Sequence, residues 1–195
     1  MEQIEQIDES VISGEELYRR FLADDSDSFE KLVELYEHDL ALFINGFVRD
    51  YHEAKHLTIE TFAQLVISGG QFSGKSSLKT YLFAIGKNLA LRYIKMRESN
   101  QHISYEEVID TLTDNETPHN LIEKEENKQY LYKAIRELKE EYRIVLELLY
   151  FNDMSYLEAG RIMNKSEKQI TNLAYRAKIL LKKKLESFGF TYSLS

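Results

Sequence analysis

SYLEAGRIMNKSEKQITNLAYRAKILLKKKL, residues 155–185, carries two helix-start signals about a dozen residues apart. Each signal is a capping box, Ser155 with Glu158 and Ser166 with Gln169, in which two side chains bond the backbone N–H groups left free at a helix start. Two capped helices joined by a short turn are typical of a helix-turn-helix. This stretch therefore predicts a helical C-terminal domain built around such a unit.

The second helix of this unit, expected from Ser166 to about Leu185, has a composition that suits a DNA major groove. Its inward stripe is apolar, and residues near its N-terminus can hydrogen-bond base edges. The cations that follow suit phosphates, which position a protein without reading sequence. The candidate DNA-binding residues are Ser166, Lys168, Gln169, Asn172, Arg176 and Lys178. An ordinary helical hairpin with a basic C-terminal end is the alternative.

Helical periodicity extends outward from this unit over most of the chain. Apolar residues recur three and four positions apart in six further stretches, which are 15–22, 27–47, 53–66, 77–96, 126–138 and 140–151. Residues 98–124 break the pattern with Pro118 and many acids, which is typical of a linker. We therefore expect an all-α fold of two small helical domains joined by a flexible linker. The expected divisions are an acidic N-terminal extension (1–14), a first domain (15–97), the linker (98–124) and the helix-turn-helix domain (125–188).

The composition excludes several classes of protein. There is no cysteine, and the five histidines show no metal-ligand spacing, so we expect no metal site, no cofactor and no catalytic residues. One proline and eight glycines in 195 residues favour helices over a turn-rich β fold. No segment has the pattern of a signal peptide or a membrane span, so a cytoplasmic protein without membrane insertion is expected.

The distribution of charge is more informative than the net charge of −8, which by itself argues against nucleic acid. Residues 74–97 contain six cations and no carboxylate, and residues 165–184 contain seven cations and one acid. Two basic tracts in an acidic chain indicate two separate contacts with a polyanion. The alternative for each tract is an ordinary solvated face.

Residues 69–76, GGQFSGKS, fit the P-loop pattern GxxxxGK[ST], in which glycine amides and a lysine hold nucleotide phosphates. That chemistry needs a strand before the loop, a helix after it and a parallel sheet around both. Residues 65–67 instead continue a helical stripe, and no run of apolar strands follows. A P-loop nucleotide-binding protein is therefore the minor alternative, and a loop between two helices is the main interpretation.

The order of these motifs resembles one family, the extracytoplasmic-function (ECF) group of bacterial RNA polymerase sigma factors. The similar segments are 22–32 (LADDSDSFEKL, the opening helix), 50–62 (DYHEAKHLTIETF, the polymerase-binding helix), 72–82 (FSGKSSLKTYL, the minus-ten element) and 155–178 (the minus-thirty-five helix-turn-helix). No single segment is diagnostic, but four in this order are specific.

The resemblance implies binding to core RNA polymerase and to promoter DNA, and an anti-sigma factor as a further partner. It implies polymerase docking by Asp50, Leu57, Glu60 and Phe62. It implies minus-ten contacts by Phe72, Ser76, Lys79, Lys87, Asn88, Arg92 and Lys95. The helix-turn-helix residues named above would meet the minus-thirty-five element. A helix-turn-helix regulator that acts without polymerase is the alternative within the class of DNA-binding proteins.

The chain also departs from the family pattern. Lys55-His56 stands where Glu-Asp is usual, and Ile59 stands where glutamine is usual. Tyr81 replaces a usual tryptophan. Gly160 replaces a usual alanine inside the first helix of the helix-turn-helix, which costs that helix up to ~1 kcal/mol of intrinsic stability.

Overall fold

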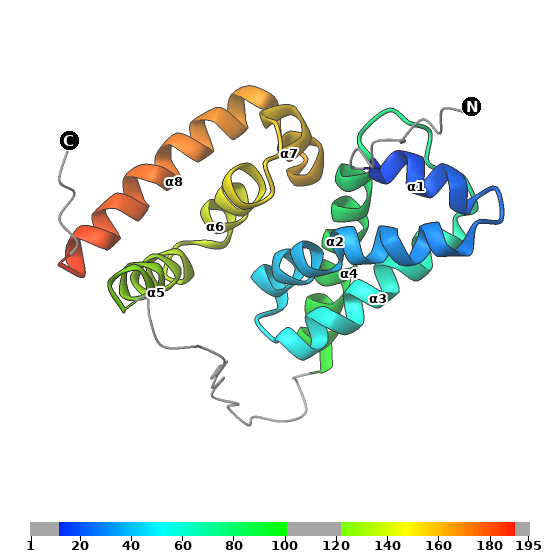
Figure 1. The fold of residues 1–195 in the computed structure, drawn as a ribbon. Helices are drawn as coiled ribbons and strands as arrows, with labels where there is room; N and C mark the ends of the chain where they lie inside the picture. The colour runs from blue at the N-terminus through cyan, green and yellow to red at the C-terminus, as the bar shows by residue number, and fades with distance from the viewer. Residues whose placement is uncertain (1–11, 101–121, 190–195) are drawn as a thin grey trace.

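In the computed structural model, which describes residues 12–100 and 122–189, the chain forms two groups of helices (Figure 1). The first group consists of α1 (Gly14–Phe21), α2 (Ser26–Val48), α3 (Tyr51–Ile67) and α4 (Leu78–Asn100). The second consists of α5 (Ile122–Arg136), α6 (Glu140–Leu146), the π-helical turn η2 (Glu147–Phe151), α7 (Tyr156–Met163) and α8 (Glu167–Ser187). No strand occurs in these described ranges, and the expected all-α fold with a C-terminal helix-turn-helix is confirmed. None of the described helices is both long enough and apolar enough to cross a bilayer.

Aspartate side chains cap the N-termini of the two middle helices of the first group, α2 and α3. Asp50 caps α3 and accepts hydrogen bonds from the backbone N–H groups of His52 (3.0 Å) and Glu53 (3.2 Å). Asp25 caps α2 and accepts from the backbone N–H of Ser28 (3.3 Å) and from its hydroxyl (2.7 Å). The sequence had predicted a start near Asp27, so α2 begins earlier than expected. The bonds from Ser28 keep the pKa of Asp25 below its usual value.

Helix α4 crosses α2 closely enough to form the core of the first group. A Cβ atom added at Gly86 would lie 3.0 Å from Leu40 Cδ1 and 3.1 Å from Ile44 Cδ1, so the glycine permits this approach. Beside the crossing, the rings of Phe43 and Phe83 pack with their centroids 4.8 Å apart. Both rings are buried at this crossing.

Both predicted capping boxes are present in the second group. At α7, the Ser155 backbone N–H donates to a Glu158 carboxylate oxygen (3.0 Å), and the Glu158 N–H donates to the Ser155 hydroxyl (3.3 Å). At α8, the Ser166 N–H donates to Gln169 Oε1 (2.8 Å), and the Gln169 N–H donates to the Ser166 hydroxyl (3.3 Å). These reciprocal bonds define where each helix begins.

The turn between α7 and α8 is tight because it folds back over Gly160. Asn164 ends α7 in the left-handed region (φ 54°), and the Lys165 N–H then donates to the Gly160 carbonyl (2.9 Å). A Cβ atom at Gly160 would lie 2.6 Å from the Lys165 carbonyl oxygen, which is closer than such atoms approach. The departure from alanine noted in the sequence is therefore required by this turn.

Two boundaries differ from those expected. Helix α4 continues to Asn100 and α5 begins at Ile122, so both helices extend into the expected linker at 98–124. No proline or glycine lies between Met96 and Asn100 to end α4 earlier. The rest of that linker, and most of the acidic extension expected at 1–14, lie outside the described residues, although α1 already begins at Gly14.

The P-loop alternative is wrong, because its fold is absent from the described part of the chain. Residues 65–67 are the last turn of α3, and the loop that follows leads directly into α4. Gly74 adopts φ 69°, and no atom lies within 4 Å of where its Cβ would be, so the glycine serves an open turn. Without a strand and a parallel sheet, this loop has no phosphate-binding architecture.

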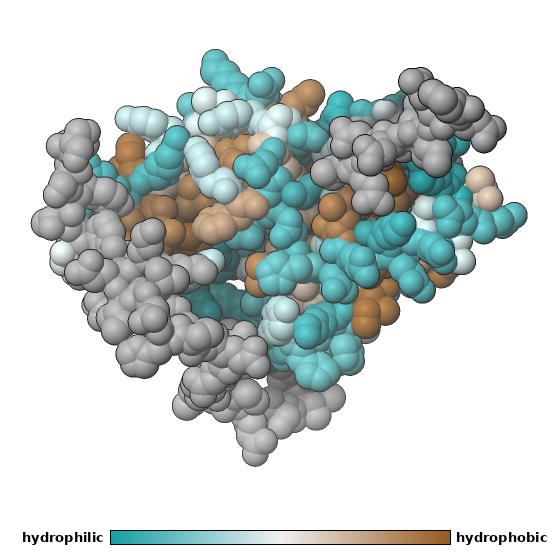
Figure 2. All heavy atoms as spheres, in the orientation of Figure 1, coloured by the Kyte–Doolittle hydropathy of each residue, from teal (hydrophilic) through white to brown (hydrophobic). Residues whose placement is uncertain are grey.

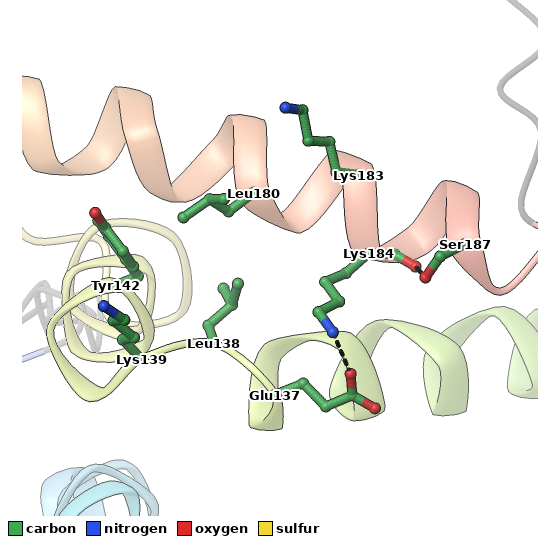
Figure 3. Close-up of a pocket in the computed structure, with 8 residues that line it drawn as sticks. All are labelled: Glu137, Leu138, Lys139, Tyr142, Leu180, Lys183, Lys184 and Ser187. Atoms are coloured by element: carbon green, nitrogen blue, oxygen red, sulfur yellow. Dashed lines mark hydrogen bonds and ion pairs between the residues drawn. The ribbon is translucent and has the colours of Figure 1, made fainter.

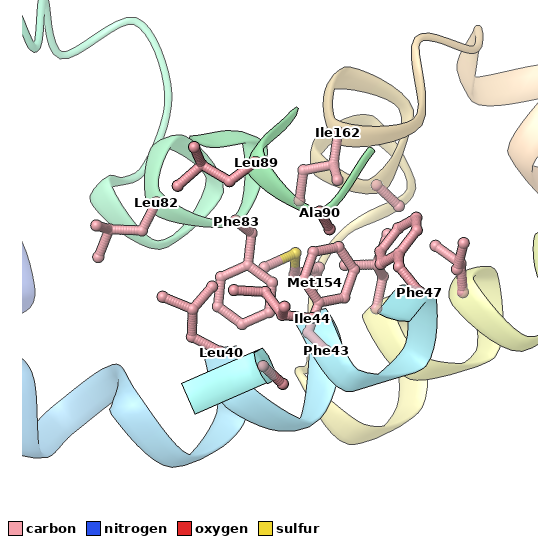
Figure 4. Packing of buried hydrophobic residues seen from close by; sticks show 14 of the residues in the cluster. Leu40, Phe43, Ile44, Phe47, Leu82, Phe83, Leu89, Ala90, Met154 and Ile162 are labelled. Carbon is pink, nitrogen blue, oxygen red and sulfur yellow. The ribbon is translucent and has the colours of Figure 1, made fainter. Parts of the chain in front are cut away.

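The two groups of helices pack against each other and share one hydrophobic cluster. Met154 and Ile162 of the second group lie beside Phe43, Phe47 and Ala90 of the first (Figure 4). All five side chains are buried. Local periodicity along the sequence did not indicate this contact, because it joins residues about a hundred positions apart.

We expect Gly160→Ala to destabilise the protein by about 1–3 kcal/mol, the usual cost of inserting a methyl group into a filled space. Gly46→Ala is the matched control, since Gly46 also lies inside a helix and the nearest atom to its added Cβ is 4.0 Å away. The control should be neutral or stabilising, because alanine favours a helix over glycine. Urea unfolding of the two variants measures this difference, and equal midpoints would contradict the role given to the turn.

Candidate nucleic-acid interface

Three polar side chains form a stripe along the outer face of α8. Lys168, Asn172 and Arg176 recur every fourth residue, so they share one face of the helix, and all are exposed. The opposite face is buried through Ile170, Ala174 and Ala177, among other residues. Because that face packs inside the domain, the stripe faces outward and can enter a groove of nucleic acid.

Ser166 and Gln169 are also exposed, but their side chains are already engaged by the capping box of α8. The Ser166 hydroxyl and the Gln169 carbonyl oxygen each accept a backbone N–H. The Gln169 amide keeps its N–H donors for another acceptor. Of the six residues predicted on this helix, these two therefore have a structural role as well.

Lys178 lies on another side of α8 from the stripe, with its Nζ over the ring of Tyr150 and 5.2 Å from the ring centroid. A hydrogen bond with Tyr150 raises the pKa of Lys178. Tyr175, which was not among the predicted residues, is 65% exposed and lies one turn from Asn172. Its exposure is visible only in the structure, since an aromatic residue in a helix is more often buried.

The loop that leads into α4 holds Phe72 in an aromatic group. The Phe72 ring packs against Tyr81 (centroids 5.4 Å apart) and, edge to face, against Tyr18 (6.1 Å). The Tyr18 hydroxyl also accepts the Gly70 N–H (3.3 Å). Phe72 and Ser76 are half-buried, so each presents only part of its side chain to a ligand.

Along α4, the predicted residues divide into an exposed set and a covered set. Asn88, Arg92 and Lys95 are exposed and lie four and three residues apart, on one side of the helix. Arg92 forms an ion pair with Glu60 of α3 (2.5 Å), which brings together residues from two different predicted sites. These three side chains are accessible to a nucleic acid.

Lys79 and Lys87 form the covered set, because the second group of helices lies against them. Lys79 Nζ donates to the backbone oxygen of Asn152 (2.9 Å), and Lys87 Nζ donates to that of Ile162 (2.6 Å). Lys79 also lies 3.6 Å from an Asp39 carboxylate oxygen. Burial, and secondarily the nearby Lys165, lower the pKa of Lys87.

Helix α3 places its predicted residues differently from what the sequence suggested. Leu57 and Phe62 are 7% and 5% exposed and belong to the core, so little of either side chain is accessible to a partner. Asp50 is engaged as the cap of α3. Ile59, between the predicted residues, is instead 69% exposed, and Val66 and Ile67 are exposed on the same helix. The predicted set therefore contains two core residues and a helix cap, and the exposed apolar residues of α3 were not among the predicted residues.

A furrow lies between α8 and the junction of α5 with α6, and hydrophobic residues gather there (Figure 2). Leu138 and Leu180 point into the furrow, while Lys184 donates to Glu137 (2.7 Å) at its edge (Figure 3). Its lining residues are Glu137, Leu138, Lys139, Tyr142, Leu180, Lys183, Lys184 and Ser187. Within the described ranges, no group of three or more histidine, aspartate or glutamate residues is placed to hold a metal ion.

The sequence matches two described families in the same order as the two groups of helices. Residues 32–99 match Sigma-70 region 2, and residues 128–181 match Sigma-70, region 4. The chain is 29% identical over 157 residues to the ECF RNA polymerase sigma factor SigM of Bacillus subtilis (strain 168), covering 80% of this chain and 93% of SigM. It is 26% identical over 180 residues to the RNA polymerase sigma-H factor of Pseudomonas aeruginosa, covering 88% of this chain and 93% of that protein.

Two solved structures have a similar fold. The structure of CnrH in complex with the cytosolic domain of CnrY superposes with a TM-score of 0.62 at 18% identity, covering 88% of this chain and 96% of that chain. The sigma factor RpoE from Bartonella quintana, in complex with the anti-sigma factor NepR, gives a TM-score of 0.63 at 20% identity, covering 81% of this chain and 96% of that chain.

We expect Leu57→Ala to destabilise the protein by about 2–5 kcal/mol, because it leaves a cavity in the core. Ile59→Ala, two residues away on the same helix, should change the unfolding free energy by no more than about 0.5 kcal/mol, since its side chain is exposed. Urea unfolding followed by circular dichroism measures both changes. A large loss of stability in the Ile59 variant would show that this side chain is part of the core.

Proposed function

The chain belongs to the extracytoplasmic-function (ECF) group of RNA polymerase sigma factors, and from this premise we propose which of its surfaces contact the polymerase and which contact each promoter element. The chain binds core RNA polymerase and directs it to promoters. In our proposal the first domain (15–97) docks on the polymerase and contacts the minus-ten element. The second (125–188) contacts the minus-thirty-five element, and the linker (98–124) sets their separation. The chain has no catalytic activity of its own, and it works in the cytoplasm, where the polymerase acts.

The exposed stripe of α8 is the observation that carries this proposal. Lys168 and Asn172 reach base edges in the major groove, while Arg176 reaches bases or phosphates one turn later. Ser166 and Gln169 position the N-terminus of α8 through their capping box, and Gln169 keeps amide donors for an acceptor on a base. Because the stripe is outward and the helix is rigidly capped, docking requires no local rearrangement.

The minus-ten element is contacted by the loop before α4 and by α4 itself. Asn88, Arg92 and Lys95 are exposed on α4 and suit the phosphates and bases of an opened strand. Phe72 and Ser76, at the start of the region, add an aromatic face and a hydroxyl. Lys79 and Lys87 complete this set of seven residues, which contains four cations for a polyanion.

Core polymerase docks on α3 through its exposed residues. Ile59, Val66 and Ile67 supply apolar area, and Glu60 supplies charge. Leu57 and Phe62 hold α3 in place from the core, and Asp50 fixes where the helix begins. This arrangement assigns binding to the outer face of α3 and a supporting role to its inner face.

An anti-sigma factor is a further partner in our proposal. One of the similar solved structures is a sigma factor bound to an anti-sigma factor, and the sigma factor in it shares the fold of this chain. The hydrophobic furrow between α8 and the α5–α6 junction and the exposed apolar residues of α3 are surfaces that a protein partner can cover.

The chain should co-purify with core RNA polymerase and support run-off transcription from its promoter. Ile59→Glu should weaken binding to core polymerase by about tenfold or more, because it places a charge in an apolar contact. Leu157→Glu is the matched control, since Leu157 is 52% exposed in α7, in the other group of helices. Binding is measured by competition with a labelled sigma factor. Failure of the unmodified chain to bind core polymerase at modest salt would refute the proposal.

Variants of α8 should separate base reading from phosphate binding. Lys168→Ala and Asn172→Ala should each reduce discrimination among minus-thirty-five sequences by about 1–3 kcal/mol. Lys183→Ala, near the C-terminal end of the helix, should weaken binding to all promoters about equally. Promoter binding by the reconstituted holoenzyme, measured on a panel of altered sites, distinguishes the two effects. Equal losses on every site from all three variants would contradict base reading by α8.

A further inference from the structure

Helix α3 carries two histidines one turn apart near its N-terminus. Residues 52–56 read HEAKH, so His52 and His56 stand four positions apart and share one face of the helix. This HExxH spacing is one that zinc sites use on helices. The expectation that the five histidines show no metal-ligand spacing is therefore wrong for this pair. His56 is also one of the residues at which the chain departs from the family pattern.

The structure brings the two imidazole rings together. Their centroids lie 4.8 Å apart, and the ring planes are inclined at 66°. Two imidazoles that bind one metal with nitrogens about 2.0–2.1 Å from it have ring centroids roughly 4.5–5.2 Å apart, for bond angles of about 90–109°. The observed separation lies within this range. Rotation of the two side chains can therefore complete a chelate without a change in the helix backbone.

Both rings are available to a ligand. His52 and His56 are exposed, and within residues 12–100 and 122–189 no hydrogen bond or ion pair engages either imidazole. Lys55 stands next to His56 in the sequence, but its Nζ lies 5.1 Å from the centroid of the Tyr51 ring. Its ammonium group is thereby held over Tyr51, on another side of the helix from the pair.

The charges of α3 around the pair favour a cation. Asp50, Glu53 and Glu60 each lie within four residues of one of the histidines, and Lys55 is the cation of α3 that lies as near in sequence. A helix N-terminus by itself disfavours a positive charge. The acids at the start of α3 offset that effect, since the Asp50 carboxylate already accepts the first backbone N–H groups.

The chemistry of the pair selects a late transition metal. Neutral imidazole suits zinc, copper and nickel, whereas magnesium and calcium prefer oxygen ligands. Closed structural zinc sites use four protein ligands and catalytic ones use three. In the part of the chain that the structure describes, no group of three or more histidine, aspartate or glutamate residues is placed to hold a metal. The pair therefore offers two ligands and leaves the other positions to water.

The histidine pair is continuous with the exposed apolar face of α3. His56 stands three residues before Ile59, and Val66 follows Ile59 by seven, so all of them lie along one side of the helix. Ile59 and Val66 are exposed and belong to the surface proposed to dock core polymerase. A hydrated dication at the end of that surface would have to lose water before the surface could be covered, which costs free energy.

We propose that His52 and His56 form a binding site for a divalent late transition metal, represented by Zn²⁺, and that the bound metal weakens docking of core polymerase on α3. The docking part rests on the proposed function, whereas metal binding does not. Because coupling between two ligands is reciprocal, bound polymerase must weaken metal binding by the same factor.

Calorimetric titration of the full chain with zinc chloride tests the site. His52→Gln and His56→Gln should each weaken the binding of Zn²⁺ by at least about tenfold, because one remaining ring cannot chelate. His38→Gln is the matched control and should leave the affinity unchanged, since His38 is exposed on α2 with no histidine four residues away. Equal affinity in all four proteins, or binding to the unmodified chain weaker than about 1 mM, would overturn the site.

Competition binding to core polymerase, with and without saturating Zn²⁺, tests the coupling. Zinc should weaken docking of the unmodified chain by about fivefold or more. It should not change docking of the double variant His52→Gln, His56→Gln, which controls for metal bound to the polymerase. An equal effect on both proteins, or no effect on either, would overturn the coupling. If the unmodified chain fails to dock even without metal, the proposed function is wrong, while the site is still decided by calorimetry.

Discussion

The burial of one face of α8 is the constraint on which the rest of the molecule depends. Ile170, Ala174 and Ala177 pack inside the second domain, and the small side chains let α8 approach its neighbours closely. Once this face is fixed, the polar residues between them must point to solvent. The turn over Gly160 then sets where α8 begins, so that the exposed stripe proposed to read bases is placed by packing and does not depend on a flexible loop.

Burial of one face also determines which residues of α4 lie outside the core. Its inner residues, including Leu82 and Phe83, complete the core of the first domain, which leaves its cations outside. Part of that cationic surface meets the second domain, where Lys79 and Lys87 donate to backbone carbonyl oxygens.

Several acidic side chains lie beside cations of the basic helices and partly neutralise them in the absence of DNA. Glu60 pairs with Arg92, Asp39 lies near Lys79, and Glu137 pairs with Lys184. Exposed pairs of this kind are weak and are screened by salt. They reconcile the net charge of −8 with the two proposed nucleic-acid surfaces, because the negative charge lies partly beside the cations and a stronger polyanion can replace it.

The sequence by itself determined the helices, both capping boxes and the outward stripe of α8, because caps and periodicity act within a few residues of one another. It also indicated which family the chain resembles. Only the tertiary structure decided that Leu57 and Phe62 are buried while Ile59 is exposed, that Gly160 lies beneath a turn, and that Lys79 and Lys87 are covered. Those properties depend on contacts between residues far apart in the chain, and local pattern carries no information about which distant surfaces meet.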